Sequence, residues 1–396
     1  MIDKEIILNK GKESSLLRFH PWVFSGAIKK ITGNPSEGDI VKVYSNNGDF
    51  LAIGHYQIGS IAVRALSFKD EKIDDNFWFK KIEQAYFLRE SLGLISDNTN
   101  CYRLVHGEGD FLPGLIIDIY KDTAVVQAHS VGIFLSKDAI ALALKKLYGT
   151  SLRAIYDKSS STAPFKASLD LKDSYLFLEG AEINELVVKE NGVNFLVDWV
   201  SGQKTGFFLD QRDNRNLLKN YSANKKVLNL FCYTGGFSLY ALLGGAQSVD
   251  SVDSSKKAIE LVERNLELNS FVGKHISYCT DALDFMRNLP SNQYDLIVVD
   301  PPAFAKHRGA LDNALRAYKK LNALAIEKVA KGGIIFTYSC SQVVDKSAFA
   351  LAVFSAAAQT KRNVRILHRL TQPADHPVSI YHPEGEYLKG LVLFVE

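Results

Sequence analysis

The chain has 396 residues, too many for one ordinary hydrophobic core, so we expect two or three domains. Its composition, 46% hydrophobic and 23% charged, is typical of folded soluble proteins, and its net charge of +3 permits a nucleic-acid partner without requiring one. No apolar run reaches the roughly 20 residues that cross a bilayer, and the N-terminal residues lack a signal-peptide pattern, so we expect a cytoplasmic protein with no membrane partner.

Residues 1–72 contain short apolar runs that alternate with polar residues and are separated by glycines. Such spacing is typical of a small β-barrel. The predicted strands are Glu5–Leu8, Asp39–Tyr44, Phe50–Ile53 and Ile61–Leu66.

Residues 73–190 mix helical and extended patterns, which predicts a small central α+β domain. Helices are expected at Asp74–Leu92 and Ser136–Leu147. Turn residues 190–192 predict a hairpin that joins two further strands. The expected strands are Tyr102–Val105, Gly114–Ile119, Ala124–His129, Arg153–Tyr156, Ile183–Lys189 and Asn194–Trp199.

Residues 191–396 alternate strands with helices, the pattern of a parallel, doubly wound α/β sheet. The expected strands are Val227–Phe231, Ser248–Val252, Ile276–Cys279, Leu296–Val299 and Ile334–Tyr338. The expected helices are Ser238–Leu243, Lys256–Leu268, Ala282–Leu289 and Asn313–Ala330.

Ligands of open α/β sheets bind outside the carboxyl ends of the strands, so the residues after each strand are candidates for a site. Gly235 and Gly236 follow the first strand, and adjacent glycines let the backbone approach a ligand at a helix N-terminus. Asp253 follows the second strand, where a carboxylate can accept hydrogen bonds from both ribose hydroxyls. Asp281 follows the third strand, where it could meet an adenine amino group.

This arrangement suits either a nicotinamide dinucleotide or S-adenosylmethionine, because both carry an adenosine ribose. The glycine turn is not the G-x-G-x-x-G that serves a pyrophosphate, and no G-x-x-x-x-G-K-[ST] phosphate loop occurs. We therefore favour S-adenosylmethionine over the dinucleotide. The structural alternative is a glycine turn that only packs a helix on a strand.

The fourth strand ends in Asp300, Pro301 and Pro302. Consecutive prolines cannot continue a strand, and they fix the direction of the preceding Asp300. This D-P-P turn resembles the substrate-base loop of class I nucleic-acid methyltransferases. Phe304 is offset by one residue from the N-P-P-[YFW] form of the adenine N6 enzymes, which argues against that target.

Longer motifs resemble one family, the bacterial and archaeal large-subunit ribosomal RNA cytosine-C5 methyltransferases. Its members carry an N-terminal PUA-type RNA-binding barrel, a small central α/β domain and a Rossmann-like catalytic domain. The resemblance implies ribosomal RNA as the partner and covers nearly the whole chain. The motifs are His20–Gly26, Ser201–Arg215, Asn229–Gly236, Asp375–Val378 and Pro383–Gly390.

Position by position, the resemblance implies two catalytic residues, Cys340 and Asp300, and a larger set around the cofactor. That set is Gln203, Phe208, Asp210, Gln211, Arg212, Phe231, Tyr233, Gly235, Asp253, Asp281 and Asp300.

Cys340 follows the strand Ile334–Tyr338 and so lies on the ligand edge of the predicted sheet. A thiolate that adds to cytosine C6 makes C5 nucleophilic enough to take a methyl group, which is covalent catalysis. Asp300 could then hydrogen-bond N3 or the exocyclic amine while charge builds on the ring. The alternative is that Cys340 only packs at a strand end. For Cys232 and Cys279 we favour packing, and the wide spacing of all four cysteines predicts neither a metal site nor disulfides.

Two other functions stay open at this point. A methyltransferase that acts on a guanine or adenine nitrogen needs no thiol, so Cys340 separates it from the cytosine enzyme. A non-catalytic RNA-binding or assembly protein could keep the same fold, although the intact glycine turn and D-P-P argue against it. The sequence does not fix the oligomeric state, and a homodimer is one alternative.

Overall fold

The structure is a computed structural model that describes residues 4–164, 169–305 and 307–396. Contacts divide the chain into two compact units, neither of which is continuous in sequence. The first unit comprises Met1–Val188, Val197–Leu209 and Ala374–Gly385. The second comprises Lys189–Leu196, Asp210–Pro373 and Glu386–Glu396. The predicted domain boundaries near residues 72 and 190 stay a prediction.

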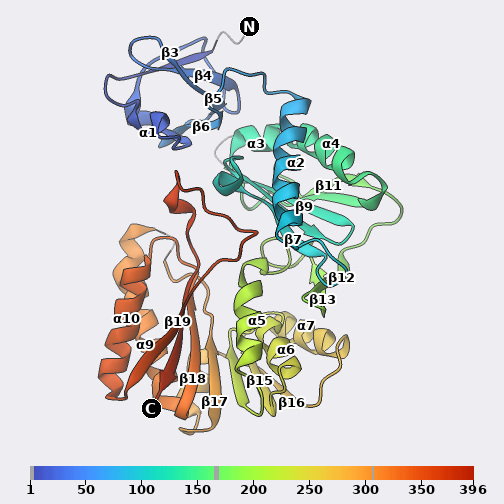
Figure 1. Cartoon of the computed structure of the whole chain (residues 1–396), viewed down its shortest axis with the longest axis vertical. Helices are drawn as coiled ribbons and strands as arrows, with labels where there is room; N and C mark the ends of the chain where they lie inside the picture. The colour runs from blue at the N-terminus through green and yellow to red at the C-terminus, as the bar shows by residue number, and fades with distance from the viewer. Residues whose placement is uncertain (1–3, 165–168, 306) are drawn as a thin grey trace. The chain divides into compact units, whose positions relative to one another are not determined.

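The N-terminal part of the first unit is a six-stranded sheet with the order β2-β6-β5-β4-β1-β3 (Figure 1). Strands β1 and β4 alternate buried and partly exposed residues, as strands with one face on a core do. The buried side chains, such as Ile6, Leu8, Val41 and Val43, form one apolar cluster. The elements are β1 (Glu5–Leu8), α1 (Ser14–Leu17), β2 (Trp22–Phe24), β3 (Ile28–Thr32), β4 (Ile40–Tyr44), β5 (Phe50–Tyr56) and β6 (Ile61–Ser67).

The rest of the first unit is built on a five-stranded sheet with the order β11-β10-β9-β8-β7. Its longest helix, α2, begins at Asp75 because the Asp74 side chain accepts a hydrogen bond from the Phe77 backbone N–H. The elements are α2 (Asp75–Ser91), β7 (Cys101–His106), β8 (Leu115–Tyr120), β9 (Thr123–Ala128), α3 (Val131–Leu135), α4 (Lys137–Tyr148), β10 (Ala154–Asp157) and β11 (Ser174–Leu178). The hairpin β12 (Glu185–Glu190) and β13 (Val193–Asp198) follows.

Residues 374–385 come from near the C-terminus but pack within the first unit. The fully buried Arg89 donates to the Asp110 carboxylate at 2.8 Å and to the Asp375 carbonyl at 2.8 Å. The Asp375 carboxylate in turn accepts the Arg103 backbone N–H at 3.0 Å. These buried contacts join the C-terminal segment to β7, more than 270 residues earlier in the chain.

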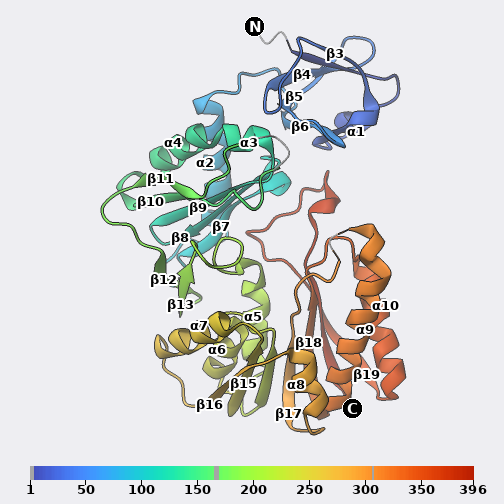
Figure 2. The same cartoon turned by 180° about the vertical axis from the view of Figure 1, so that it is seen from behind.

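The second unit is a seven-stranded sheet with the order β16-β15-β14-β17-β18-β20-β19 (Figures 1 and 2). Strands β14 to β18 are parallel, whereas β20 runs antiparallel to both of its neighbours. The chain order reverses between β14 and β17, so their carboxyl ends flank the switch point where ligands of such sheets bind.

The second unit contains the elements that carry the predicted site. They are α5 (Arg212–Asn220), β14 (Lys226–Leu230), α6 (Gly236–Leu243), β15 (Ser248–Asp253), α7 (Lys256–Glu267), β16 (Lys274–Cys279), α8 (Ala282–Asn288), β17 (Tyr294–Val299), α9 (Leu311–Lys328), β18 (Val329–Ser339), α10 (Lys346–Thr360), β19 (Val364–Thr371) and β20 (Lys389–Val395). Buried residues of the sheet and of α8, α9 and α10 form one apolar cluster. Among the described residues, no helix is long and apolar enough to cross a membrane.

Candidate functional site

The turn after β14 holds three residues in the left-handed backbone region, Phe231 (φ 58°), Tyr233 (φ 47°) and Gly235 (φ 80°). Only glycine adopts this region without cost, and each aromatic residue there is strained by roughly 1–2 kcal/mol. A side chain at Gly235 would also meet Val262 at 3.1 Å. Strain of this kind persists where a backbone is shaped for a ligand.

Asp253 ends β15 and is held by backbone groups on both carboxylate oxygens. Oδ2 accepts the Tyr233 N–H at 3.0 Å, and Oδ1 accepts the Ser255 N–H at 2.9 Å. These two hydrogen bonds orient the carboxylate. Each oxygen has a further lone pair, so the carboxylate can still accept hydrogen bonds from two ligand hydroxyls. The turn after β14 and the end of β15 are therefore one rigid piece of the site.

Asp281 lies at the same sheet edge, after β16, but its side chain is exposed. Its Oδ1 atom accepts the backbone N–H groups of Leu283 (2.8 Å) and Asp284 (3.0 Å), which makes Asp281 the N-cap of α8. The helix cap accounts for one oxygen, and Oδ2 is the atom that could face an adenine amino group.

Asp300, at the end of β17, lies beside residues of the short helical turn Leu209–Gln211. Gln211 Nε2 donates to Asp300 Oδ2 at 3.0 Å, and the Tyr387 hydroxyl donates to Asp210 Oδ2 at 2.8 Å. The other oxygen of Asp210, Oδ1, is buried and has no hydrogen-bond partner among the described residues. A buried, unsatisfied carboxylate oxygen is costly, which indicates that a ligand completes this site.

Burial, followed by the negative charge of Asp210, raises the pKa of Asp300 to about 7. The hydrogen bond from Gln211 and the charge of Arg215 act in the opposite direction. The carboxylates of Asp300 and Asp210 therefore repel each other, and a positively charged ligand beside them would stabilise the ionised form of Asp300.

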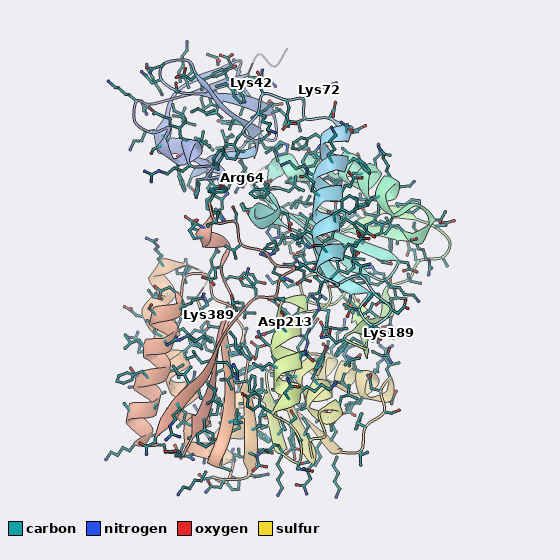
Figure 3. All side chains as sticks on the ribbon, in the orientation of Figure 1. Lys42, Arg64, Lys72, Lys189, Asp213 and Lys389 are labelled. Atoms are coloured by element: carbon teal, nitrogen blue, oxygen red, sulfur yellow. The ribbon has the colours of Figure 1, made fainter. Side chains whose placement is uncertain are left out.

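Cys340 follows β18, the strand that pairs with β17, and is partly buried. Burial, followed by the charges of Asp300 and Asp210, raises the pKa of its thiol to about 12. The positive charge of Lys389, at the start of β20 (labelled in Figure 3), acts in the opposite direction. Lys389 Nζ donates to the carbonyls of Ser341, at 2.6 Å, and Val344, and burial lowers the pKa of Lys389 to about 8.

Arg212 and Arg215 point to Glu190 at the end of β12. The Arg215 guanidinium donates to both Glu190 oxygens at 2.8 and 2.6 Å, and Arg212 Nε lies 3.6 Å from Glu190 Oε2. All three side chains are buried. Arg212 thus has an ion-pair partner within the protein, and its predicted contact with a cofactor stays a prediction.

Several other predicted positions lie outside this arrangement. Gln203, exposed, and Phe208, half-buried, belong to the segment Val197–Leu209 of the first unit, so their place at the cofactor stays a prediction. Cys232 is buried in the turn after β14, in line with packing. Cys279 is exposed on the edge strand β16, so the expectation that it packs in the interior is wrong.

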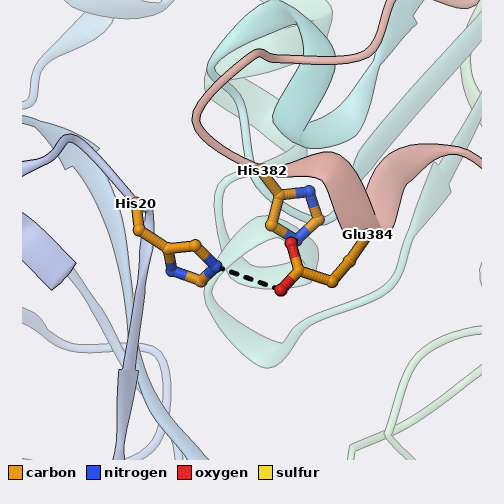
Figure 4. A group of neighbouring side chains, drawn as sticks. All are labelled: His20, His382 and Glu384. Atoms are coloured by element: carbon orange, nitrogen blue, oxygen red, sulfur yellow. Dashed lines mark ion pairs between the residues drawn. The ribbon is translucent and has the colours of Figure 1, made fainter.

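A group of potential metal ligands, unexpected from the sequence, consists of His20, His382 and Glu384 (Figure 4). His20 Nε2 lies 3.6 Å from Glu384 Oε1, and His382 Nε2 lies 3.9 Å from Glu384 Oε2. However, His20 Nδ1 accepts the Trp22 backbone N–H at 3.2 Å, which places the proton of the neutral ring on Nε2. That nitrogen then faces Glu384 as a donor and cannot also be a metal ligand.

Two sequence families match this chain. A PUA-like domain matches residues 6–68, and the S-adenosylmethionine-dependent methyltransferase family matches residues 167–387, more than half of the chain. The chain belongs to the S-adenosylmethionine-dependent methyltransferases. The predicted cofactor is therefore confirmed, as are the PUA-like N-terminal part and the Rossmann-like fold.

Curated relatives of this methyltransferase include proteins named ribosomal RNA large subunit methyltransferase I. The protein from Aeromonas hydrophila is 41% identical over 98% of both chains, and that from Vibrio cholerae is 41% identical over 97% of this chain and 98% of its own. A structure assigned as a SAM-dependent methyltransferase from Streptococcus mutans covers both chains fully, with 25% identity and a TM-score of 0.83. A second methyltransferase structure, complexed with SAH, has 25% identity and a TM-score of 0.84 over the full length of both chains.

The residues of the second unit fit the methyl donor. S-adenosylmethionine carries a sulfonium, an ammonium and a carboxylate group, and its net positive charge suits the neighbouring carboxylates of Asp300 and Asp210. Its ribose suits the doubly anchored Asp253. Sequence reasoning missed Tyr387, Lys389 and the Glu190–Arg215 pair, although the motif Pro383–Gly390 contains the first two.

Proposed function

We propose that this methyltransferase transfers the methyl group of S-adenosylmethionine to C5 of a cytosine in large-subunit ribosomal RNA, in the cytoplasm. The names of the 41% identical relatives support ribosomal RNA as the substrate. The observation that carries the cytosine target is the position of Cys340, beside Asp300 at the carboxyl ends of two paired parallel strands. A nitrogen methyltransferase has no use for a thiol at this place.

In the proposed reaction, the Cys340 sulfur forms a bond to cytosine C6. Its proton passes to the Asp300 carboxylate, and Asp300 gives a proton to N3 as the ring electrons move toward C5. A group with a pKa of about 7 suits both steps, because it accepts and releases a proton near neutral pH. When bound, S-adenosylmethionine supplies an electrophilic methyl group on a sulfonium whose charge also favours the ionised forms of Asp300 and Cys340.

After C5 has gained the methyl group, its hydrogen must leave as a proton. We assign Asp210 as the base, because its Oδ1 is buried, has no described partner and belongs to the same charge cluster as Cys340. As that C–H bond breaks, the C5=C6 double bond forms again and the C6–S bond breaks. The N3 proton returns through Asp300 to the departing Cys340 sulfur, which restores the thiol, and Asp210 releases the C5 proton. The net products are 5-methylcytosine, S-adenosylhomocysteine and one proton. Because C5 faces the methyl donor, such a base also borders the cofactor.

Lys389 has a positioning role in this scheme. Its ammonium group binds the carbonyls of Ser341 and Val344, which fixes the loop that carries Cys340. Its positive charge also lowers the cost of forming a thiolate there.

The test is nucleoside mass spectrometry of large-subunit ribosomal RNA after incubation with the purified protein and S-adenosylmethionine. RNA from cells that lack the gene is the substrate. We expect 5-methylcytosine with wild type and with Cys279→Ala, which removes an exposed cysteine, and none with Cys340→Ala. A methylated guanine or adenine, or normal activity of Cys340→Ala, would overturn the proposal.

A further inference from the structure

The first unit contains a cavity of about 590 Å³ that lies between the N-terminal sheet and the first turns of α2. Residues at the end of β6, on the connection to α2 and near the start of α2 line it, together with Phe19, Phe111 and Ser379. Lys72, on that connection, is labelled in Figure 3. The cavity volume lies within the range of sites that bind small molecules or single nucleotides, roughly 300–1,000 Å³.

Two phenylalanines in this cavity are exposed and have strained backbones. The side chains of Phe19 and Phe111 are 48% and 52% exposed, and both residues have left-handed backbones, with φ angles of 61° and 58°. The Phe19 ring packs edge-on against Phe68 with a centroid distance of 5.2 Å, which fixes its orientation. Neither ring gains the burial that would offset the backbone strain, so their exposure points to a ligand.

Lysines surround the phenylalanines. Lys69, Lys72 and Lys80 are exposed, and Lys81 Nζ lies 5.9 Å from the centre of the Phe111 ring. Among the described residues, only Lys72 of these four has a carboxylate within ion-pair distance, that of Asp74 at 3.7 Å. The acidic residues of the lining have partners of their own: Asp74 caps α2, Glu108 accepts the Trp22 indole N–H at 2.9 Å and Glu71 accepts the Ser67 hydroxyl. The lining holds four lysines, Lys69, Lys72, Lys80 and Lys81, against three carboxylates, Glu71, Asp74 and Glu108, so a surplus of one positive charge faces an anionic ligand.

We propose that this cavity binds one unpaired nucleotide of the RNA substrate, outside the methyl-transfer site. The base stacks on Phe19 and Phe111, and the flanking phosphates meet Lys69, Lys80 and Lys81. Aromatic rings beside cations are how proteins bind unstacked bases of single-stranded RNA, whereas double-stranded RNA offers no free base face. The proposal rests on the proposed function, because it takes RNA as the substrate.

Binding of the full-length protein to fluorescent RNA tests this inference, with a single-stranded oligonucleotide and a duplex of the same sequence as probes. Phe19→Leu and Phe111→Leu keep an apolar side chain but remove the ring. Phe87→Leu is the matched control, because Phe87 is 54% exposed on α2 and does not line the cavity. We expect each cavity variant to bind the single strand about 5- to 30-fold more weakly, with the control at wild-type affinity.

Two further measurements sharpen the test. Lys80→Ala and Lys81→Ala should each reduce the salt dependence of RNA binding by close to one counterion. Urea denaturation curves that match wild type would show that the variants are folded. With a 4-thiouridine-containing single strand, ultraviolet cross-linking should label the peptides that contain Phe19 or Phe111.

The inference is wrong if Phe19→Leu and Phe111→Leu bind the single strand as tightly as Phe87→Leu does. It is also wrong if they lose affinity only for ribosomal particles and not for naked RNA, since the cavity would then contact protein. Neither result affects the proposed function as long as wild type forms 5-methylcytosine. Failure of wild type to methylate any RNA would instead remove the proposed function.

Discussion

The second unit contains two buried groups of charged side chains that differ in one respect. Around Glu190, the guanidinium groups of Arg212 and Arg215 supply positive charge, and every Glu190 oxygen has a close donor. Around Cys340, the carboxylates of Asp210 and Asp300 repel each other, while Lys389 opposes them at the thiol and Arg215 opposes them at Asp300. The Glu190 group is fully paired and holds elements in place, whereas Oδ1 of Asp210 has no hydrogen-bond partner among the described residues. Residues of both groups occur in one short segment, 210–215, so sequence proximity does not separate their roles.

Among substitutions of the buried carboxylates, Asp210→Asn has the largest expected effect. An amide cannot take the C5 proton, so turnover should fall by a factor of roughly 10² to 10⁴. The methylated, covalent protein–RNA adduct should then accumulate on ordinary cytosine, visible as a band that migrates slowly under denaturing conditions. An equal fall in turnover without any adduct, together with weaker binding of S-adenosylmethionine, would make Asp210 a cofactor ligand only.

The second-largest expected effect is a loss of stability when the ion pairs of Glu190 with Arg212 and Arg215 are broken. Glu190→Gln leaves two buried guanidinium groups without a counter-charge, so the free energy of unfolding should fall by roughly 3 kcal/mol or more. Urea denaturation measures this change. Glu260→Gln, which breaks the exposed pair with Lys256, is the control and should change stability little. Equal stability of the two variants would contradict the structural role of Glu190.

Asp253→Ala should weaken the binding of S-adenosylmethionine by about 1–3 kcal/mol, the usual value of hydrogen bonds to a charged group. Isothermal titration calorimetry of both proteins with S-adenosylmethionine measures this change in affinity. Asp281→Ala removes an exposed helix cap and should lose less affinity, because one of its oxygens is used by α8. If Asp281→Ala loses more affinity than Asp253→Ala, the assignment of the ribose site is wrong.

The smallest effect is the pH dependence of donor binding. Because the pKa of free Asp300 is raised to about 7, the carboxyl group is largely protonated at pH 6 and ionised at pH 8. A cationic donor prefers the ionised form, so affinity should rise by up to about tenfold between these pH values. In Asp300→Asn, donor affinity should not show this rise. Titration of the donor itself affects wild type and the variant equally, so the difference between their pH profiles reports on Asp300. Identical pH profiles would place Asp300 away from the donor.

Strand ends were predictable from the sequence because apolar runs bounded by glycine, proline and aspartate mark them. This signal located Gly235, Asp253, Asp300 and Cys340 at one edge of a parallel sheet, before any long-range contact was known. Strands β2, β3, β11, β19 and β20 were missed. The residues of β3 and β11 are mostly half-buried or exposed and show no alternation.

The positions of Lys389 and of the Glu190–Arg215 pair could not be predicted from the sequence, because they depend on contacts between distant parts of the chain. Lys389 reaches the Cys340 loop because β20 pairs antiparallel with β18, which places Lys389 opposite Ser339. Glu190 meets Arg215 across 25 residues of sequence. A pairing of this kind depends on tertiary packing, and no local pattern of residues encodes it.

The central claim, that Cys340 adds to cytosine, is tested most directly with RNA that carries 5-fluorocytosine at the target position. Fluorine cannot leave C5 as a proton does, so the covalent intermediate cannot resolve. Intact mass spectrometry of wild type and Cys279→Ala should show the mass of one RNA fragment plus a methyl group, and Cys340→Ala should show the free protein alone. Absence of an adduct with wild type, under conditions where it methylates ordinary RNA, would contradict the claim.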